Sequence, residues 1–123
     1  MGKINAKQKG ARFERELADL FRKMGYAGAR RTAQYCGNTG DASDVVGLPG
    51  IHVEAKHQET MRLYDWMAQA KRDSDGKSEL TAVFHKKNRA DILVTMTLGD
   101  WMQIYAVYEA ATVSDGDNID VRR

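Results

Sequence analysis

The sequence predicts a single α/β domain with a central mixed β-sheet flanked by helices. Its 123 residues are enough for one hydrophobic core and too few for two. Segments with apolar residues at helical spacing alternate along the chain with short β-branched runs of strand length. This order is typical of a sheet with helices packed on its faces.

The first element is an amphipathic helix from about Ala6 to Met24, followed by Gly25 as a stop signal. Its apolar residues recur at helical spacing and are Phe13, Leu17, Leu20, Phe21 and Met24. At 100° per residue, Glu14 lies at a border of this apolar stripe, whereas Arg15 points outward. Glu14 is therefore expected beside packed surface, and Arg15 is expected to face solvent.

A strand over 28–36 and a turn-rich loop over 37–43 come next. Asp44-Val45-Val46 and the run Ile51 to His57 then flank a Pro-Gly turn, which predicts a β-hairpin. A turn centred on 48–49 places Asp44 opposite Val53 and next to Glu54. Because side chains alternate along a strand, His52, Glu54 and Lys56 share the face opposite to Ile51, Val53 and Ala55.

The second half of the chain predicts a helix over 61–73, strands over 80–85 and 91–98, and a last helix that opens at Gly99-Asp100. Both strands are nearly continuous apolar runs, which is typical of strands covered on both faces. The tail is polar, so we expect a folded domain over 1–112 and a flexible C-terminal tail over 113–123.

Composition narrows the functional classes. The net charge is only +2, yet residues 1–35 hold nine Lys or Arg against three acids, a pattern that a nucleic-acid-binding region would produce and that a charged helix face would also produce. No apolar run is long enough to cross a membrane, and the basic start lacks the core of a secretory signal, so we expect a cytoplasmic protein with no membrane partner. Cys36 is the only cysteine, which leaves no disulfide framework within the chain.

The predicted hairpin gathers Asp44, Glu54 and Lys56 at one place. Glu54 and Lys56 alone could be an exposed ion pair of little energetic value. With Asp44 beside them, two carboxylates and a backbone carbonyl form a hard-cation site that suits Mg²⁺. Phosphodiester hydrolysis is the chemistry that such a site serves, because a metal neutralises the phosphate and acidifies a water.

These residues also carry a family resemblance. Asp44 followed ten residues later by Glu54-Ala55-Lys56 resembles the PD-(D/E)XK nuclease motif, and the run from Lys9 to Glu16, KGARFERE, resembles the KGxxxERE opening of archaeal-type Holliday junction resolvases. The later run from HVEAKHQE to DILVTM is similar to small resolvase-like nucleases of bacteriophages. The resemblance covers residues 8–105 and implies the restriction-endonuclease-like fold.

The resemblance implies a metal-dependent, structure-specific endodeoxyribonuclease, most specifically a Holliday junction resolvase. Its cofactor would be Mg²⁺, with Mn²⁺ as a substitute, and its partner would be four-way or other branched DNA. A homodimer is also implied, as is the bacterial host cytoplasm if a phage encodes the protein. The alternatives are another PD-(D/E)XK endonuclease acting on flaps, nicks or duplex DNA, and a non-catalytic DNA-binding protein of the same fold.

Carried over residue by residue, the family implies catalytic roles for Glu14, Asp44, Glu54 and Lys56. The metal ligands would be Asp44, Glu54, Glu14 and the Ala55 backbone carbonyl. Ser43 stands where the motif has its proline, and Asp41 is a rival for Asp44. We prefer Asp44 because it begins a strand, which would hold a ligand steady.

The predicted DNA-binding residues are basic and lie in the N-terminal region and the loop after residue 85: Lys9, Arg12, Arg15, Arg30, Arg31, Lys86, Lys87 and Arg89. A merely solvated loop is the alternative for the last three. Gln69 matches a glutamine often found on the helix after the ExK strand, and His52 shares the face of Glu54; both are accessory candidates. His52 could equally be an ordinary strand histidine. Large aromatic residues at helical spacing, Trp66, Trp101, Tyr105 and Tyr108, indicate core or a dimer face.

Overall fold

The structure is a computed structural model, and it describes residues 5–32, 43–77 and 79–114. Along these residues the elements are α1 (Ala6–Lys23), β1 (Arg30–Arg31), β2 (Val45–Val46), β3 (Ile51–His57), α2 (Leu63–Asp73), β4 (Leu80–Lys86), β5 (Leu93–Thr95) and α3 (Leu98–Ser114). The predicted α/β class with a mixed sheet is confirmed.

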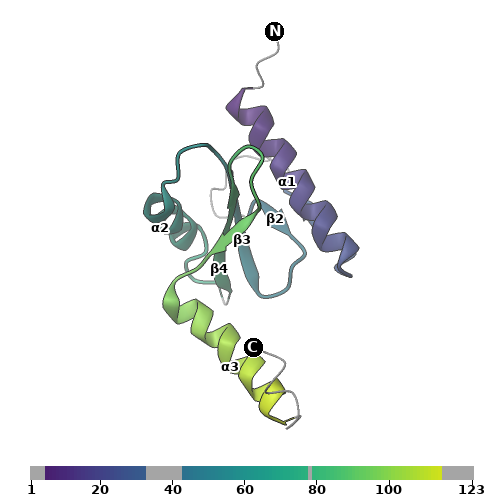
Figure 1. Ribbon diagram of the computed structural model, residues 1–123, viewed down its shortest axis with the longest axis vertical. Coiled ribbons are helices and arrows are strands. Elements are labelled where there is room, and N and C mark those ends of the chain that lie inside the picture. Colours follow the sequence, from purple (N-terminus) through teal and green to yellow (C-terminus); the bar gives the residue numbers. More distant parts are fainter. Residues whose placement is uncertain (1–4, 33–42, 78, 115–123) are drawn as a thin grey trace.

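The sheet has the strand order β1-β2-β3-β4-β5, so β3 is its central strand. β3 and β4 run parallel, and α2 makes the crossover between them, whereas the other neighbouring strands pair antiparallel. Figure 1 shows α1 and α2 on opposite sides of the sheet, with α3 extending away from it. The strand that carries Glu54 and Lys56 is therefore covered from both sides.

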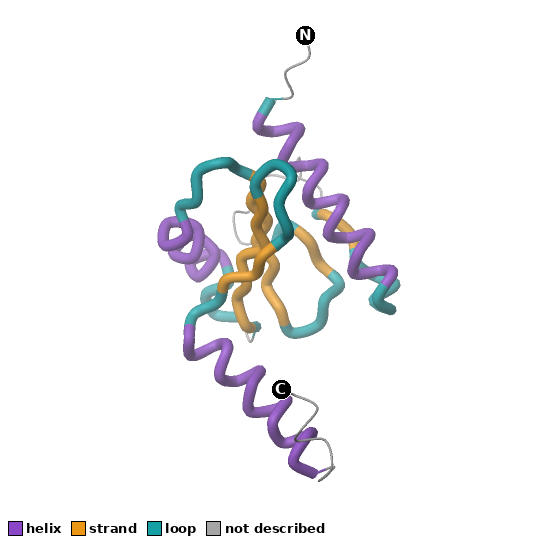
Figure 2. Tube along the Cα trace, viewed as in Figure 1, coloured by secondary structure: helices purple, strands orange, loops and turns teal. Residues whose placement is uncertain are grey.

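The larger core lies between α1 and one face of the sheet (Figure 2). Phe13, Leu17 and Phe21 are buried on α1, at the helical spacing that the sequence shows. They pack with Val53 and Ala55, two of the β3 residues whose side chains point to this face. Because strand side chains alternate, the packing of Val53 and Ala55 turns Glu54 and Lys56 to the other face.

A smaller cluster packs α2 against the opposite face. Trp66 and Ala70 are buried there together with Val83 of β4, and Leu63 and Met67 pack at its edge. Val83 is the register partner of Glu54 in the parallel pair. α2, the helix that follows β3, is thus fixed over the face of the sheet that carries Glu54.

The hairpin forms as predicted, with a register one residue away from the expected one. Val45, rather than Asp44, is the Cα partner of Val53, while the Asp44 N–H still donates to the Val53 carbonyl at 2.8 Å. The turn needs Gly47, whose φ is 97° and where a Cβ would lie 2.5 Å from the Ala29 backbone. Close passage of the turn over Ala29 leaves room for no side chain at position 47.

Three element predictions differ from the structure. β1 is described only at Arg30–Arg31, and residues 33–42, with Cys36 and Asp41, lie outside the described residues. β5 is shorter than 91–98 and is not covered on both faces, because Leu93 and Val94 on this edge strand are more than half exposed. α3 begins at Leu98, one residue before the expected opening at Gly99, and continues to Ser114; residues 115–123 lie outside the described residues.

α3 is attached to the body near its N-terminus. The Asp100 carboxylate accepts a hydrogen bond from the Thr81 N–H at 3.1 Å and faces Lys71 Nζ of α2 at 3.4 Å. Beyond this point large apolar side chains stay exposed on the helix: Trp101, Met102, Ile104, Val107 and Tyr108. Trp66 is core as predicted, whereas Trp101 and Tyr108 are not. Within the described ranges, no helix has the length and apolarity needed to cross a membrane.

Candidate active site

β3 presents Glu54 and Lys56 on the face toward α2. Glu54 is only 4% exposed, and its Oε2 lies 3.8 Å from Nζ of the half-buried Lys56. A carboxylate so buried is not the solvated surface pair that the sequence alone left open. The pair is instead enclosed between the sheet and α2, where an ion pair interacts in a lower dielectric than in water.

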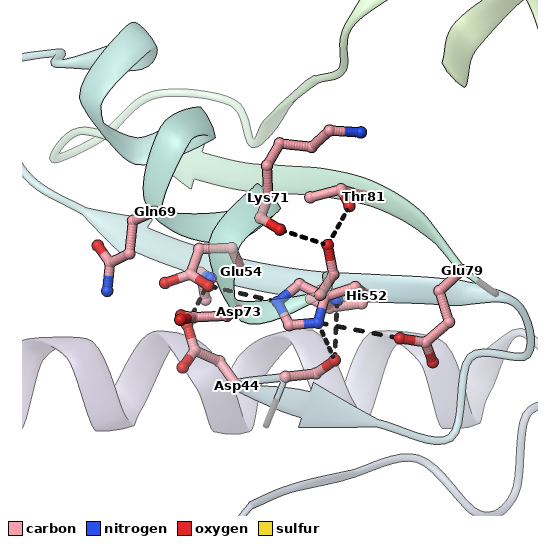
Figure 3. Close-up of polar contacts among 12 residues, drawn as sticks. Asp44, His52, Glu54, Gln69, Lys71, Asp73, Glu79 and Thr81 are labelled. Carbon is pink, nitrogen blue, oxygen red and sulfur yellow. Dashed lines mark hydrogen bonds and ion pairs between the residues drawn. The ribbon is translucent and has the colours of Figure 1, made fainter. Parts of the chain in front are cut away.

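Asp44 is fixed beside Glu54 by its own backbone and side chain. Its N–H donates to the Val53 carbonyl, and its carbonyl accepts from the Thr32 N–H at 3.0 Å. Its Oδ2 accepts a hydrogen bond from the Ala55 N–H at 2.8 Å. Figure 3 shows the side chains of Asp44, which directly precedes β2, and of Glu54 on β3 pointing toward one another. Hydrogen bonds with Val53 and Thr32 thus fix the backbone of Asp44, and the bond from Ala55 fixes one oxygen of its carboxylate.

The electrostatics of Asp44 reflect this crowding. The pKa of Asp44 is raised from 3.8 to about 7; burial is the largest cause, the charge of nearby Glu54 also raises it, and the Ala55 hydrogen bond and the charge of Lys56 lower it. The Glu14 carboxylate raises the pKa of Asp44 as well. Three carboxylates thus interact here, and a cation would relieve their repulsion.

Glu14 reaches this region from α1. Its side chain is buried, and its Oε1 accepts two hydrogen bonds from Arg31, 3.1 Å from Nε and 3.0 Å from Nη2. Burial raises the pKa of Glu14, the hydrogen bond and charge of Arg31 lower it, and the charge of Glu54 raises it. Arg31, predicted as a DNA contact, is thus engaged with the site's third acidic residue.

Gln69 is the accessory residue that the structure brings to Lys56. Its Oε1 accepts a hydrogen bond from Lys56 Nζ at 3.4 Å, across the gap between α2 and β3. Lys56 therefore lies between an amide oxygen and the Glu54 carboxylate. This arrangement limits where the ammonium group can point, as a catalytic lysine requires.

The donors at this site fit a hard divalent cation. Over the described ranges, no three histidine, cysteine or acidic side chains form a metal-binding group by themselves. Mg²⁺ commonly takes only one or two carboxylates and keeps several waters, which suits Asp44 and Glu54. The raised pKa of Asp44 and the oxygen ligands that both side chains offer are the features that favour such an ion.

His52 has two neighbours that the sequence pattern did not indicate, Ser43 and Glu79. The ring is fully buried, its Nδ1 lies 3.0 Å from Ser43 Oγ, and its Nε2 lies 3.7 Å from Glu54 Oε1. Glu79 Oε1 lies 3.9 Å from Nδ1. The alternation along β3 signalled that His52 shares the face of Glu54, but the contact with Ser43 depends on the hairpin register.

Apart from Arg31, which contacts Glu14, the predicted DNA-binding residues fall into two groups. Lys9 and Lys86 form ion pairs with Glu59 and Glu16, at 3.9 and 3.8 Å. The exposed basic residues lie on α1, on β1 and in the loop after β4, and are Arg12, Arg15, Arg30, Lys87 and Arg89. Within the described residues, the side chains of this second group form no ion pair, so they can contact phosphates without breaking one.

The loop between β4 and β5 is held in a defined conformation. The Asn88 N–H donates to Glu59 Oε2 at 2.7 Å, and Asn88 Oδ1 lies 3.0 Å from His57 Nε2. Arg89 has a φ of 58°, a left-handed conformation that costs a residue with a Cβ free energy. The exposed Arg89 is thus presented from an anchored, strained turn.

Comparisons with known proteins identify the family of the chain. Residues 5–118 match the model of a family described as "Phage putative PDDEXK endonuclease". Among solved structures, Hjc of Archaeoglobus fulgidus, a Holliday junction resolvase from an archaeal hyperthermophile, is similar with a TM-score of 0.54 and 25% identity, over 71% of this chain and 76% of that chain. No curated protein gives a significant match. The chain therefore belongs to the phage PDDEXK endonuclease family, a group of the PD-(D/E)XK nucleases.

Proposed function

We propose that this endonuclease is a Mg²⁺-dependent Holliday junction resolvase that hydrolyses phosphodiester bonds in branched DNA. The observation that carries the proposal is the pair of the half-buried Asp44, directly before β2, and the buried Glu54 on β3, with Lys56 Nζ 3.8 Å from Glu54. The likeness to the Archaeoglobus resolvase supports branched DNA as the substrate. Mn²⁺ is expected to replace Mg²⁺, because both accept oxygen ligands.

Asp44 and Glu54 would hold the cation, with the Ala55 carbonyl and Glu14 as the further ligands that the family resemblance implies. When bound, a divalent cation would neutralise negative charge on the scissile phosphate and lower the pKa of a bound water. Lys56, which is held by Gln69 and Glu54, would orient the attacking water. The expected products carry 5′-phosphate ends, as the resemblance implies.

The exposed basic side chains would hold the DNA backbone. Arg12, Arg15 and Arg30 lie on the N-terminal part of the chain, and Lys87 and Arg89 lie on the anchored loop after β4. Phosphate contacts of this kind fix the register of DNA without reading its sequence. As a phage protein, it would act on DNA in the cytoplasm of the bacterial host.

A homodimer is part of this proposal, and its support is α3. The helix carries large apolar side chains around its circumference, and Val107 is 72% exposed. A helix that is apolar all round is normally buried, so this one needs a covering partner. A second copy would also place two active sites for two symmetric cuts in a junction.

Cleavage assays decide between the proposal and its alternatives. A labelled four-way junction, a flap, a nicked duplex and a linear duplex are incubated with wild-type protein in Mg²⁺ or in EDTA. The resolvase proposal expects Mg²⁺-dependent cuts in the junction and far weaker cutting of the linear duplex. Preference for a flap, nick or duplex would replace it with another PD-(D/E)XK specificity.

The same assay with Glu54→Ala and Lys56→Ala tests the site. Both variants are expected to bind the junction without cutting it. Cleavage that survives both substitutions would place the chemistry elsewhere in the chain. A wild-type protein that binds the junction and cuts no DNA in Mg²⁺ or Mn²⁺ would be a non-catalytic DNA-binding protein of this fold.

A further inference from the structure

His52 is a polar side chain in a place where packing alone would accept an apolar one. It is 0% exposed and lies on β3 two residues before Glu54, on the same face. Over the residues that the structure describes, its Nε2 has no hydrogen-bond partner. A buried nitrogen without a partner is unfavourable, so its surroundings need an explanation.

The hydrogen bonds around Ser43 assign the proton on this ring. The Val53 N–H donates to Ser43 Oγ at 3.3 Å, and Ser43 Oγ lies 3.0 Å from His52 Nδ1. Because Oγ already accepts from Val53, its own hydrogen is free to be donated to Nδ1. Nδ1 then accepts, and the ring carries its hydrogen on Nε2.

This tautomer turns an N–H toward Glu54. Nε2 lies 3.7 Å from Glu54 Oε1, a few tenths of an ångström beyond a hydrogen bond. The opposite tautomer would turn a lone pair of Nε2 toward the buried Glu54 carboxylate, which is repulsive. The tautomer with the hydrogen on Nε2 turns the Nδ1 lone pair toward Ser43 Oγ at 3.0 Å, and the carboxylate on that side, Glu79, is farther away at 3.9 Å and partly exposed to water. Glu54 Oε2, the other oxygen, lies 3.8 Å from Lys56 Nζ. The two oxygens of Glu54 thus face two different donors.

We infer that Ser43 and His52 form a positioning relay that orients the Glu54 carboxylate through an N–H on His52 Nε2. The inference rests on the proposed function, in which Glu54 is a metal ligand. Ligating carboxylates are commonly oriented by hydrogen bonds from residues behind them. Ser43 is also the neighbour of Asp44, so the relay connects the backbones that carry both proposed ligands.

The first test is independent of metal and of cleavage. Nitrogen-15 spectra of the imidazole rings are recorded on the metal-free protein, and the His52 signals are assigned by their loss in His52→Asn. The relay requires a protonated Nε2, and Glu54→Gln should shift its resonance. A bare Nε2 would overturn the inference, because no donor would then face Glu54.

The second test measures Mn²⁺ affinity by titration calorimetry for wild type, His52→Gln and His52→Asn. Gln keeps an N–H near the position of Nε2, whereas Asn keeps only an acceptor for Ser43. We expect about 10–100-fold weaker binding for His52→Asn and a clear recovery for His52→Gln. Circular dichroism confirms that each variant is folded under the titration conditions.

The outcomes separate the two proposals. Equal Mn²⁺ affinity in wild type and folded His52→Asn would reduce His52 to a packing residue and overturn the relay. Absence of Mn²⁺ binding and of cleavage in wild type would remove the proposed function instead. In that case the ring spectra still decide whether His52 donates to Glu54.

Discussion

Arg31 of β1 and Glu14 of α1 are joined by two hydrogen bonds to one carboxylate oxygen, at 3.1 and 3.0 Å. The pair fastens the N-terminal half of α1 to the edge of the sheet beside the site. Glu14 is buried and Arg31 is half-buried, so each is the main charge compensation of the other. Removing one partner would leave the other with an uncompensated charge.

Arg31→Ala is therefore expected to destabilise the protein by about 1–3 kcal/mol, measured by urea denaturation. In a double-mutant cycle, the same change made in Glu14→Gln should cost less, because the carboxylate charge is already gone. Arg30→Ala is the matched control, since Arg30 is an exposed neighbour on the same strand. Equal losses from Arg31→Ala in both backgrounds would contradict the pairing.

Asp44 predicts a stability that depends on pH. Its pKa is raised from 3.8 to about 7, so the folded state binds the proton more tightly than the unfolded state does. The carboxyl group thus favours folding at low pH and loses this contribution as pH rises between these two values. In EDTA at about pH 8, Asp44→Asn should be more stable than wild type by about 1–3 kcal/mol, and the difference should vanish near about pH 4.

Mg²⁺ should reverse the order of stability between wild type and Asp44→Asn. Millimolar Mg²⁺ at about pH 8 is expected to raise the melting temperature of wild type and leave that of Asp44→Asn unchanged, because a ligand that binds only the folded state stabilises it. Asp65→Asn, an exposed change on α2, is the control and should behave as wild type. An Asp44→Asn variant no more stable than wild type in EDTA would count against the crowding of carboxylates.

Lys56 and Gln69 predict a graded loss of cleavage. Lys56→Ala should lower the single-turnover rate by about 10²-fold or more while junction affinity changes little, since the loss falls on the chemical step. Gln69→Ala should lower the rate by about 10-fold, because Lys56 keeps its charge and loses one anchor. Arg72→Ala, exposed on α2, is the control. A Gln69→Ala rate equal to wild type would show that this hydrogen bond has no catalytic effect.

Arg89 predicts opposite changes in stability and in DNA binding. Glycine tolerates the φ of 58° without a steric penalty, so Arg89→Gly should stabilise the fold by about 0.5 kcal/mol. The same variant should bind a four-way junction more weakly. The slope of the logarithm of the binding constant against the logarithm of salt concentration should fall by about one, as expected for the loss of one phosphate contact. Lys77→Gly changes a charge elsewhere on the surface and is the binding control. Unchanged affinity would mean that the loop is only solvated.

α3 predicts a concentration-dependent assembly. Val107→Glu places a charge where a second copy would pack, and it should convert a dimer into a monomer in light-scattering and sedimentation experiments. Junction cleavage should change from paired to single nicks. Glu109→Gln, on the same exposed helix, is the control. A wild-type protein that is monomeric at all concentrations would contradict the proposed dimer.

Local periodicity predicted the parts of the fold that depend on neighbouring residues. The alternation along β3 gave the faces of Val53, Glu54 and Lys56, and the spacing on α1 placed Glu14 beside the core. The apolar run at 91–98 was misleading, because hydrophobicity does not say whether a strand lies inside a sheet or at its edge. In the same way, α3 is apolar without being covered by its own chain.

Contacts between distant residues were the part that the sequence could not supply. Arg31 and Glu14 are 17 positions apart and meet because α1 lies across the sheet edge. The Ser43–His52 contact depends on the hairpin register, which differs by one residue from the expected one. Gln69 could be related to Lys56 only through the family resemblance, and the structure adds the hydrogen bond that joins them.

The central position of β3 has a consequence for how the enzyme fails under stress. A middle strand loses its amide hydrogen bonds only when its neighbours separate, so its amides should exchange with solvent only through global unfolding. Glu54 and Lys56 then cannot be lost by fraying, whereas β5 and α3 can open independently. In the proposed dimer, heat should therefore weaken subunit assembly before it damages the proposed active site, and brief warming should yield intact but separated subunits.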